Sequence, residues 1–254
     1  MHPSLGEKLS GQLLSAMNDN HHLNVRLASE NVLKAVCDTV SPQGVAAIVD
    51  IPKPFCPTDD AIENESGRRD DGTKVKSKFY LIFDGISDPG NVGTLLRSAK
   101  AVGAEAVLLL PNSCDVWNPK AIRSAMGTSF QVPIRQCGSW TECMEFLERE
   151  CGVVGDRIYA ATMEDEDGNG DKDKVHIKSK PHFQVDWMNE SNALILGKEG
   201  PGLSQELRSS VKEGQIRSVY VPMEAGIESL NAAVCGSVIM FEYLRQYQIQ
   251  VSLD

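Results

Sequence analysis

From residue 78 onward, apolar positions switch repeatedly between a strand-like and a helical pattern. Short apolar runs rich in β-prone residues predict strands, and apolar residues three and four positions apart predict helices. The expected strands cover 79–84, 106–110, 157–162, 193–196 and 219–221. The expected helices cover 91–102, 139–151 and 230–247. This alternation predicts an α/β fold with a mostly parallel sheet, helices on both faces and ligands at the carboxyl ends of the strands.

The first part of the chain is patterned differently. Apolar residues at helical spacing predict a helix around 9–17 and a second over 31–36, and the apolar run 45–51 predicts a strand. Prolines and an aperiodic charged stretch over 52–77 indicate a linker. We therefore expect a small, truncated α+β module at 1–51, a linker at 52–77 and the main domain at 78–254.

Composition is that of an ordinary soluble protein. Hydrophobic residues make up 41% of the chain, and no apolar run reaches the roughly 18 residues that a membrane span needs. The seven cysteines lack metal-ligand spacing, which predicts free thiols in an intracellular compartment and no metal site.

The first twenty residues resemble neither a signal nor a transit peptide. We expect the cytoplasm, or a mitochondrion or chloroplast if a transit peptide is missing from this chain.

The net charge of −10 lacks the basic excess that nucleic-acid-binding proteins usually show. However, segments 59–71 and 164–174 together hold twelve acidic and four basic residues. The rest of the chain, with 23 acidic and 21 basic residues, therefore carries a net charge of only −2. We expect both segments to be loops, the second a flexible insertion.

Three polar motifs follow predicted strands. The first, Asn91 to Arg97, opens a helix, so we expect Asn91 to be its N-cap and Gly93 to leave room for a ligand beside Arg97. The second, Gly197 to Leu203, has three glycines whose backbone can approach a ligand closely, but it fits neither a dinucleotide fingerprint nor a Walker A loop.

The third motif, 222–231, precedes a helix so apolar that we expect it to lie in the core or in a subunit interface. Taken alone, Ser229 reads as the cap of that helix. Each motif also has a simpler reading, as a capped helix with a solvated arginine, a strand-to-helix turn, or a cap followed by a core helix.

Together, the three motifs resemble the SpoU family of the SPOUT methyltransferase superfamily over about residues 78–248. The matching patterns are N-x-G-x-x-x-R, G-x-E-G-x-G-L and P-M-x-x-G-x-x-S-L-N, with Lys198 standing where the family usually has Asn. Segment 41–46 also resembles the end of the small RNA-binding module that precedes many SpoU domains.

The resemblance implies a C-terminal trefoil knot, S-adenosylmethionine as methyl donor, and a homodimer formed through the C-terminal helix. The substrate would be a ribose 2′-hydroxyl of RNA, with ribosomal RNA as first choice and tRNA as second. Two alternatives remain: a non-catalytic, RNA-binding ribosome-assembly factor on the same fold, and a different nucleotide-binding α/β enzyme.

The resemblance also assigns roles to residues. Arg97 matches the catalytic arginine, which we interpret as orienting a phosphate or stabilising the forming alkoxide, because a guanidinium keeps its proton. The polar positions that would assist it are Asn91, Glu199, Ser229 and Asn231. The positions that would bind the donor are Leu196, Gly197, Gly202, Val221, Pro222, Met223 and Leu230.

Overall fold

The structure is a computed structural model, and it separates into two compact units, Met1–Asp50 and Ile51–Asp254. The residues that it describes are 26, 28–37, 44–57, 77–162, 179–188, 190–227 and 229–253. The helix predicted around 9–17 and both acidic segments lie outside these residues. Among the described helices, none combines the length and the hydropathy that crossing a membrane requires.

The first unit contains helix α2 (Glu30–Val36), which confirms the second predicted helix. Ser29 caps α2 by accepting a hydrogen bond from the Val32 N–H at 3.5 Å. The prediction of a strand over 45–51 is wrong, because this run has no regular secondary structure and its residues are exposed. An apolar run becomes a strand only where a neighbouring strand satisfies its backbone groups, and no described strand pairs with this one.

The second unit is built on a sheet in which all pairings between described strands are parallel. The strand order is β3-β2-β1-β6-β4-β7-β5. The strands are β1 (Phe79–Asp84), β2 (Ala106–Leu109), β3 (Ile134–Gln136), β4 (Ile158–Ala161), β5 (Lys180–Pro181), β6 (Asn192–Gly197) and β7 (Arg217–Tyr220).

Helices cover both faces of this sheet, as predicted. They are α3 (Pro89–Val102), α4 (Pro119–Ala125), α5 (Trp140–Cys151), α6 (Gln205–Lys212) and α7 (Ala232–Leu253). Alternate β1 residues point to opposite faces: Phe79, Leu81 and Phe83 pack with α3, α4 and α7, whereas Tyr80 and Ile82 pack with α5 and α6. The predicted α/β class is therefore confirmed, and the trefoil knot stays a prediction.

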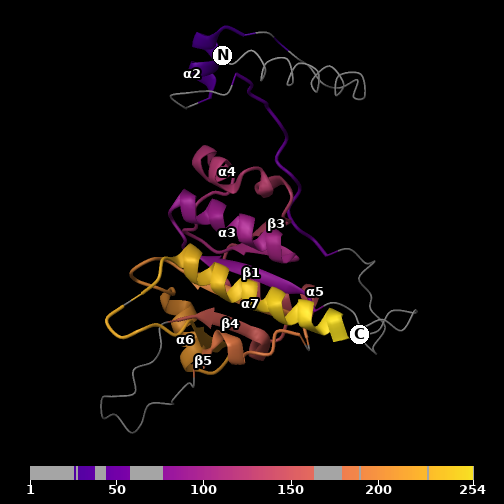
Figure 1. Ribbon diagram of the computed structural model, residues 1–254, viewed down its shortest axis with the longest axis vertical. Helices are drawn as coiled ribbons and strands as arrows, with labels where there is room; N and C mark the ends of the chain where they lie inside the picture. The colour runs from indigo at the N-terminus through magenta and orange to yellow at the C-terminus, as the bar shows by residue number, and fades with distance from the viewer. Residues whose placement is uncertain are drawn as a thin grey trace, which may run out of the picture. The chain divides into compact units, whose positions relative to one another are not determined.

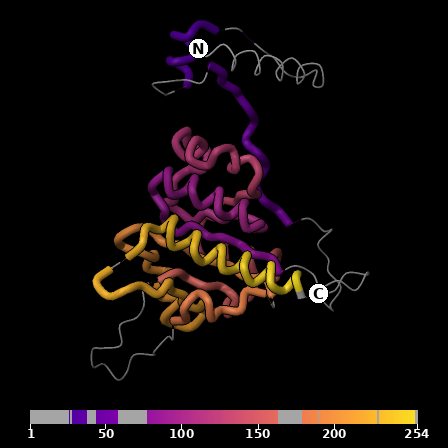
Figure 2. Tube along the Cα trace, viewed as in Figure 1, coloured from indigo at the N-terminus to yellow at the C-terminus, as the bar shows by residue number. Residues whose placement is uncertain are grey.

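Helix α7 crosses the sheet beside α3, as Figures 1 and 2 show. Gly236 makes this approach possible, because a Cβ there would lie 2.4 Å from Leu196 Cδ1 and 2.8 Å from Leu95 Cδ2. One side of α7 is buried through Ile239, Met240 and Tyr243. The sequence analysis missed the short elements α4, α6, β3 and β5, which carry too few apolar positions to show a period.

Phe55 lies in the segment expected to be a linker, yet it belongs to the second unit. Its N–H donates to the Ile134 carbonyl at 2.7 Å, and its ring contacts the rings of Tyr80 and Phe146. The chain is therefore anchored to the sheet at this residue, before the first strand begins.

Candidate functional site

The first two motifs begin side by side at the carboxyl edge of the sheet. Strands β1 and β6 are neighbours, and their register pairs Asp84 with Gly197 at the strand ends. The segment leading into α3 and the glycine-rich loop therefore leave the sheet at the same level. Strand β7 is separated from β6 by β4, and the third motif returns from β7 to start α7.

A cavity of about 590 Å³ opens between these loops. It is lined by Ala161, Thr162, Leu196, Gly197, Lys198, Glu199, Gly200, Pro201, Gly202, Leu203, Arg208, Val221, Met223, Ser229, Leu230, Asn231, Ala232 and Cys235. A volume of this size suits a ligand as large as a nucleoside derivative. The cavity lies where parallel α/β sheets usually bind ligands, outside the carboxyl ends of the strands.

The glycine-rich loop folds back on itself over Gly197. The N–H of Lys198 donates to the Gly202 carbonyl at 3.1 Å, and the N–H of Gly202 donates back to the Lys198 carbonyl at 2.9 Å. A Cβ on Gly197 would lie 2.7 Å from the carbonyl carbon of Gly202, so only glycine fits there. Gly200 and Gly202 have φ of 78° and 72°, which also favour glycine.

Arg208, on α6, holds the far side of this loop. Its Nε donates to the Leu203 carbonyl and its Nη2 to the Pro201 carbonyl, both at 2.7 Å. On the side of the loop that faces the end of β1, the buried Asp84 carboxylate accepts the N–H of Ser204. Burial raises the pKa of Asp84 above its usual range, although the bond from Ser204 and the charge of Arg208 oppose this effect. The loop shape is thus fixed from two directions.

Three polar residues, one from each motif, form a hydrogen-bonded chain. The Asn91 side-chain amide donates to the Glu199 carboxylate, and Asn231 Nδ2 donates to Asn91 Oδ1 at 3.1 Å. Because Asn91 and Asn231 lie at the starts of α3 and α7, the chain ties two helix ends to the glycine-rich loop. Among the described residues, no side-chain hydrogen bond joins the exposed Arg97 to this chain or to any other residue.

The helix caps differ from those predicted. Asp88 caps α3 by accepting the N–H of Asn91 at 2.9 Å, so the prediction that Asn91 is the N-cap is wrong. Asn231 Oδ1 accepts the N–H groups of Ala233 and Val234 at 2.9 and 3.3 Å, which makes it the cap of α7 in place of Ser229. Asn91 is left free to bond Glu199, and Asn231 both caps its helix and bonds Asn91.

The interpretation of Gly93 is also wrong. Gly93 is buried, and a Cβ there would lie 2.5 Å from Ser124 Cβ and 2.6 Å from the Ala121 carbonyl oxygen. The missing side chain therefore allows α3 and α4 to pack closely, and it does not leave room for a ligand.

Most of the predicted site residues come together. Nine of them line the cavity: Leu196, Gly197, Glu199, Gly202, Val221, Met223, Ser229, Leu230 and Asn231. Asn91 does not line the cavity but bonds two residues that do, Glu199 and Asn231, whereas Pro222 and Arg97 are not among the lining residues.

The sequence analysis missed several lining residues: Ala161, Thr162, Arg208, Ala232 and Cys235. Ala161 and Thr162 enter because β4 lies between β6 and β7, an order that no local pattern reveals. Burial raises the pKa of the Cys235 thiol to about 11, so it stays protonated near neutral pH and is a poor nucleophile.

Comparison with known proteins gives one consistent family. Residues 78–241 match the SpoU rRNA Methylase family. The chain is 31% identical over 237 residues to "rRNA methyltransferase 3A, mitochondrial" of Danio rerio, covering 84% of this chain and 52% of that protein. It is 29% identical to the "23S rRNA (guanosine(2553)-2′-O)-methyltransferase RlmP" of Bacillus subtilis, covering 85% of this chain and 70% of the relative.

The fold is similar to solved structures of the same kind. The SpoU methyltransferase AviRb from Streptomyces viridochromogenes, solved in complex with AdoMet, matches with a TM-score of 0.55 and 28% identity. This match covers 68% of the present chain and 61% of AviRb. The chain spans about half the length of the first vertebrate relatives that it matches.

Proposed function

This chain belongs to the SpoU rRNA methylase family, and on that premise we propose that it methylates a ribose 2′-hydroxyl of RNA with S-adenosylmethionine as donor. Ribosomal RNA is the first substrate to test and tRNA the second, because the relatives from Danio rerio and Bacillus subtilis are named rRNA methyltransferases. The observation that carries the proposal is the cavity of about 590 Å³ that the second and third motifs line together.

The cavity fits the donor by size and by chemistry. Gly197, Gly202, Val221 and Leu230 line it, and the close approach of Gly197 to the Gly202 backbone leaves no space for a side chain at Gly197. We propose that these groups hold S-adenosylmethionine, together with Leu196, Met223 and the strand-end residue Pro222. When bound, this donor supplies a methyl group activated by its sulfonium.

We assign the chemistry on the acceptor side to the first motif. Arg97 carries a permanent positive charge at the surface of α3, where it can orient an RNA phosphate or stabilise the alkoxide that forms on the 2′-oxygen. Asn91, Glu199 and Asn231 hold the start of α3 against the glycine-rich loop, which positions Arg97 indirectly. Ser229, on the cavity wall, completes the polar set.

Calorimetry tests the proposal directly. We expect S-adenosylmethionine to bind with micromolar affinity, about −8 kcal/mol. Single-turnover transfer of a labelled methyl group to ribosomal RNA, followed by mapping of ribose methylation, would identify the substrate. Absence of donor binding, with tight NAD binding in its place, would contradict the proposed function.

We also propose that the protein is a homodimer through α7. The side of α7 away from the core exposes Val234, Val238 and Phe241, with 49%, 37% and 48% of each residue accessible. These positions are spaced four and three apart and therefore form one apolar stripe. A contiguous exposed stripe of this kind marks an interaction surface.

We propose the same arrangement of parts as the sequence indicates, with a partial RNA-binding-like module at 1–51, a connection at 52–77 and the methyltransferase domain at 78–254.

Relatives from Danio rerio and Mus musculus are named mitochondrial, which favours a mitochondrion over the cytoplasm. Imaging of the tagged, full-length protein in its own cells would test the location.

A further inference from the structure

Helix α3, which carries the first motif, and the neighbouring helix α4 are unusually basic for this acidic protein. Helices α3 and α4 contain four exposed or half-exposed cations, Arg97, Lys100, Lys120 and Arg123, and neither helix contains an aspartate or glutamate. Two acids lie beside these helices: Asp88, which caps α3 and lies 3.3 Å from Lys120, and Asp115, which accepts the N–H of Trp117 at 3.0 Å just before α4. Figure 1 shows α4 on the outer side of α3, away from β1.

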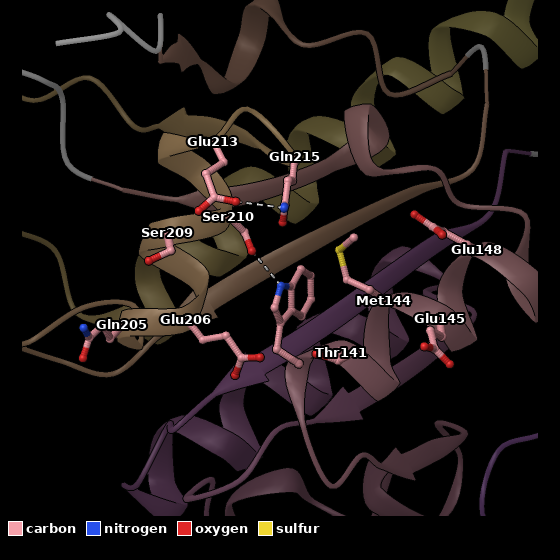
Figure 3. Close-up of a pocket in the computed structure, with 11 residues that line it drawn as sticks. Thr141, Met144, Glu145, Glu148, Gln205, Glu206, Ser209, Ser210, Glu213 and Gln215 are labelled. Atoms are coloured by element: carbon pink, nitrogen blue, oxygen red, sulfur yellow. Dashed lines mark hydrogen bonds between the residues drawn. The ribbon is translucent and has the colours of Figure 1, made fainter. Parts of the chain in front are cut away.

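A cavity on the opposite face of the sheet is lined by acidic side chains. This second cavity, of about 770 Å³, lies between α5 and α6 and is lined by four glutamates, Glu145, Glu148, Glu206 and Glu213. Figure 3 shows these glutamates around the cavity, and no lysine or arginine is among the residues that line it. Such a cavity repels the phosphates of a nucleic acid, which favours an approach of RNA from the side of α3 and α4.

An exposed aromatic ring lies next to the basic helices. Phe130, in the short 3-10 helix η2 (Thr128–Phe130) after α4, is 42% exposed. Its ring packs at 5.4 Å from the Trp117 ring, and its N–H donates to the Gly127 carbonyl at 3.2 Å. One residue later, the Gln131 carbonyl accepts a hydrogen bond from Lys100 Nζ at 3.4 Å, so the ring and the cation of α3 are neighbours.

One ion pair and two hydrogen bonds connect the same face to the donor cavity. Lys120 pairs with Asp88, Asp88 accepts the N–H of Asn91, and the Asn91 side chain donates to Glu199 in the cavity wall. A nucleic acid bound along α3 and α4 would therefore pass beside the start of α3, where the cavity opens.

We propose that α3, α4 and η2 form the face that docks the RNA substrate, with Phe130 stacking on an unpaired base and Lys100, Lys120 and Arg123 contacting phosphates. The inference rests on the proposed function and names the part of the molecule that recognises the substrate. Stacking on an aromatic ring requires a base that is free of its helix, so the face selects single-stranded or looped RNA over a continuous duplex.

Fluorescence anisotropy with a labelled 20-nucleotide oligouridine tests this face. We expect Phe130→Ala to weaken binding about 5- to 100-fold, the usual effect of removing one stacked base contact. The matched control is Phe183→Ala, because Phe183 is 52% exposed on a different element, η4 (His182–Gln184), and should leave the affinity unchanged.

Salt titration tests the phosphate contacts. We expect Arg123→Ala to weaken binding and to reduce the slope of log affinity against log salt by about 0.7, the value for one phosphate contact on a single strand. The control is Arg149→Ala, which removes an equal charge from the exposed side of α5. A 20-base-pair RNA duplex should bind more weakly than oligouridine, and its affinity should not respond to Phe130→Ala.

The docking face is contradicted if wild-type protein does not bind oligouridine, or if Phe130→Ala and Arg123→Ala behave like their controls. Equal losses in all four variants would also contradict it, because the effect would then be one of total charge or folding. Donor calorimetry on the same proteins separates the two proposals: oligouridine binding without donor binding would contradict the proposed activity and leave the docking face intact.

Discussion

The side-chain amide of Asn231 donates a hydrogen bond to Asn91 Oδ1 at 3.1 Å, although the two residues lie 140 positions apart in the chain. This bond joins the starts of α3 and α7, and the Asn91 side-chain amide in turn donates a hydrogen bond to the Glu199 carboxylate. Asn231 also caps α7 with its Oδ1 atom. One residue thus has a structural role and a proposed positioning role that use different atoms and can be separated by mutation.

Asn231→Asp keeps an oxygen that can cap α7 but removes the donor to Asn91. We expect it to slow single-turnover methyl transfer on the order of 10²-fold, since displaced catalytic groups lose about that much, while unfolding stability changes little. Asn231→Ala removes the cap as well and should also cost about 1 kcal/mol of stability. If both variants retain the wild-type rate constant, the hydrogen-bonded chain only supports the fold.

Arg97→Ala tests the proposed acceptor-side role. If Arg97 stabilises charge in the transition state, its loss should reduce the single-turnover rate constant by about 10²–10³-fold and leave donor binding by calorimetry intact. Arg97→Lys should restore little, because an ammonium does not reproduce the planar guanidinium. A solvated arginine with no role would instead change stability by less than about 0.5 kcal/mol and leave the rate unchanged.

Asp84→Asn tests the buried carboxylate under the glycine-rich loop. Because burial raises the pKa of Asp84 in the folded state, its ionisation opposes folding, and wild-type stability should fall as the pH rises above about 4, the usual value for aspartate. The variant lacks this ionisation, and its amide oxygen can still accept the Ser204 N–H. In urea unfolding, the free energy of unfolding of the variant relative to wild type should be higher at pH 8 than at pH 5. An equal difference at both pH values would contradict the raised pKa of Asp84.

Gly93→Ala tests the close packing of α3 on α4. The added Cβ would meet Ser124 and the α4 backbone at 2.5–2.6 Å, so the helices must separate. We expect a loss of about 1–3 kcal/mol in unfolding free energy, the usual cost of overpacking. Thr94→Ala, at the neighbouring exposed position, is the control and should change stability little. Equal stabilities would show that α4 can move aside without strain.

Phe241→Glu tests the homodimer. A charge at the C-terminal end of the exposed stripe on α7 should prevent two copies from burying it, so light scattering should show the mass of a single chain, 27.7 kDa, in place of a dimer. The control is Val154→Glu, since Val154 is 51% exposed on another part of the domain. A wild-type protein that is already monomeric at micromolar concentration would contradict the dimer itself.

The alternation of strand-like and helical patterns of apolar residues was enough to predict the α/β class and most of the long elements. Runs such as Phe79–Asp84 are buried throughout in the structure, as continuous apolar strands of a parallel sheet should be. Nine of the predicted site residues line one cavity, because glycines and polar residues after a strand lie at the edge of the sheet where ligands usually bind. Family membership likewise followed from residues 91–97, 197–203 and 222–231 alone.

Tertiary structure decided what those residues do. The fit of Gly93 depends on α4, the partner of Asn91 depends on the β1–β6 register, and the entry of Thr162 depends on the position of β4. The run 45–51 shows the same limit, since its composition favours a strand that no described neighbour completes. Local sequence determines which conformations a segment favours, whereas hydrogen-bond partners and close contacts depend on residues far away in the chain, and these are set only when the strands take their order in the sheet.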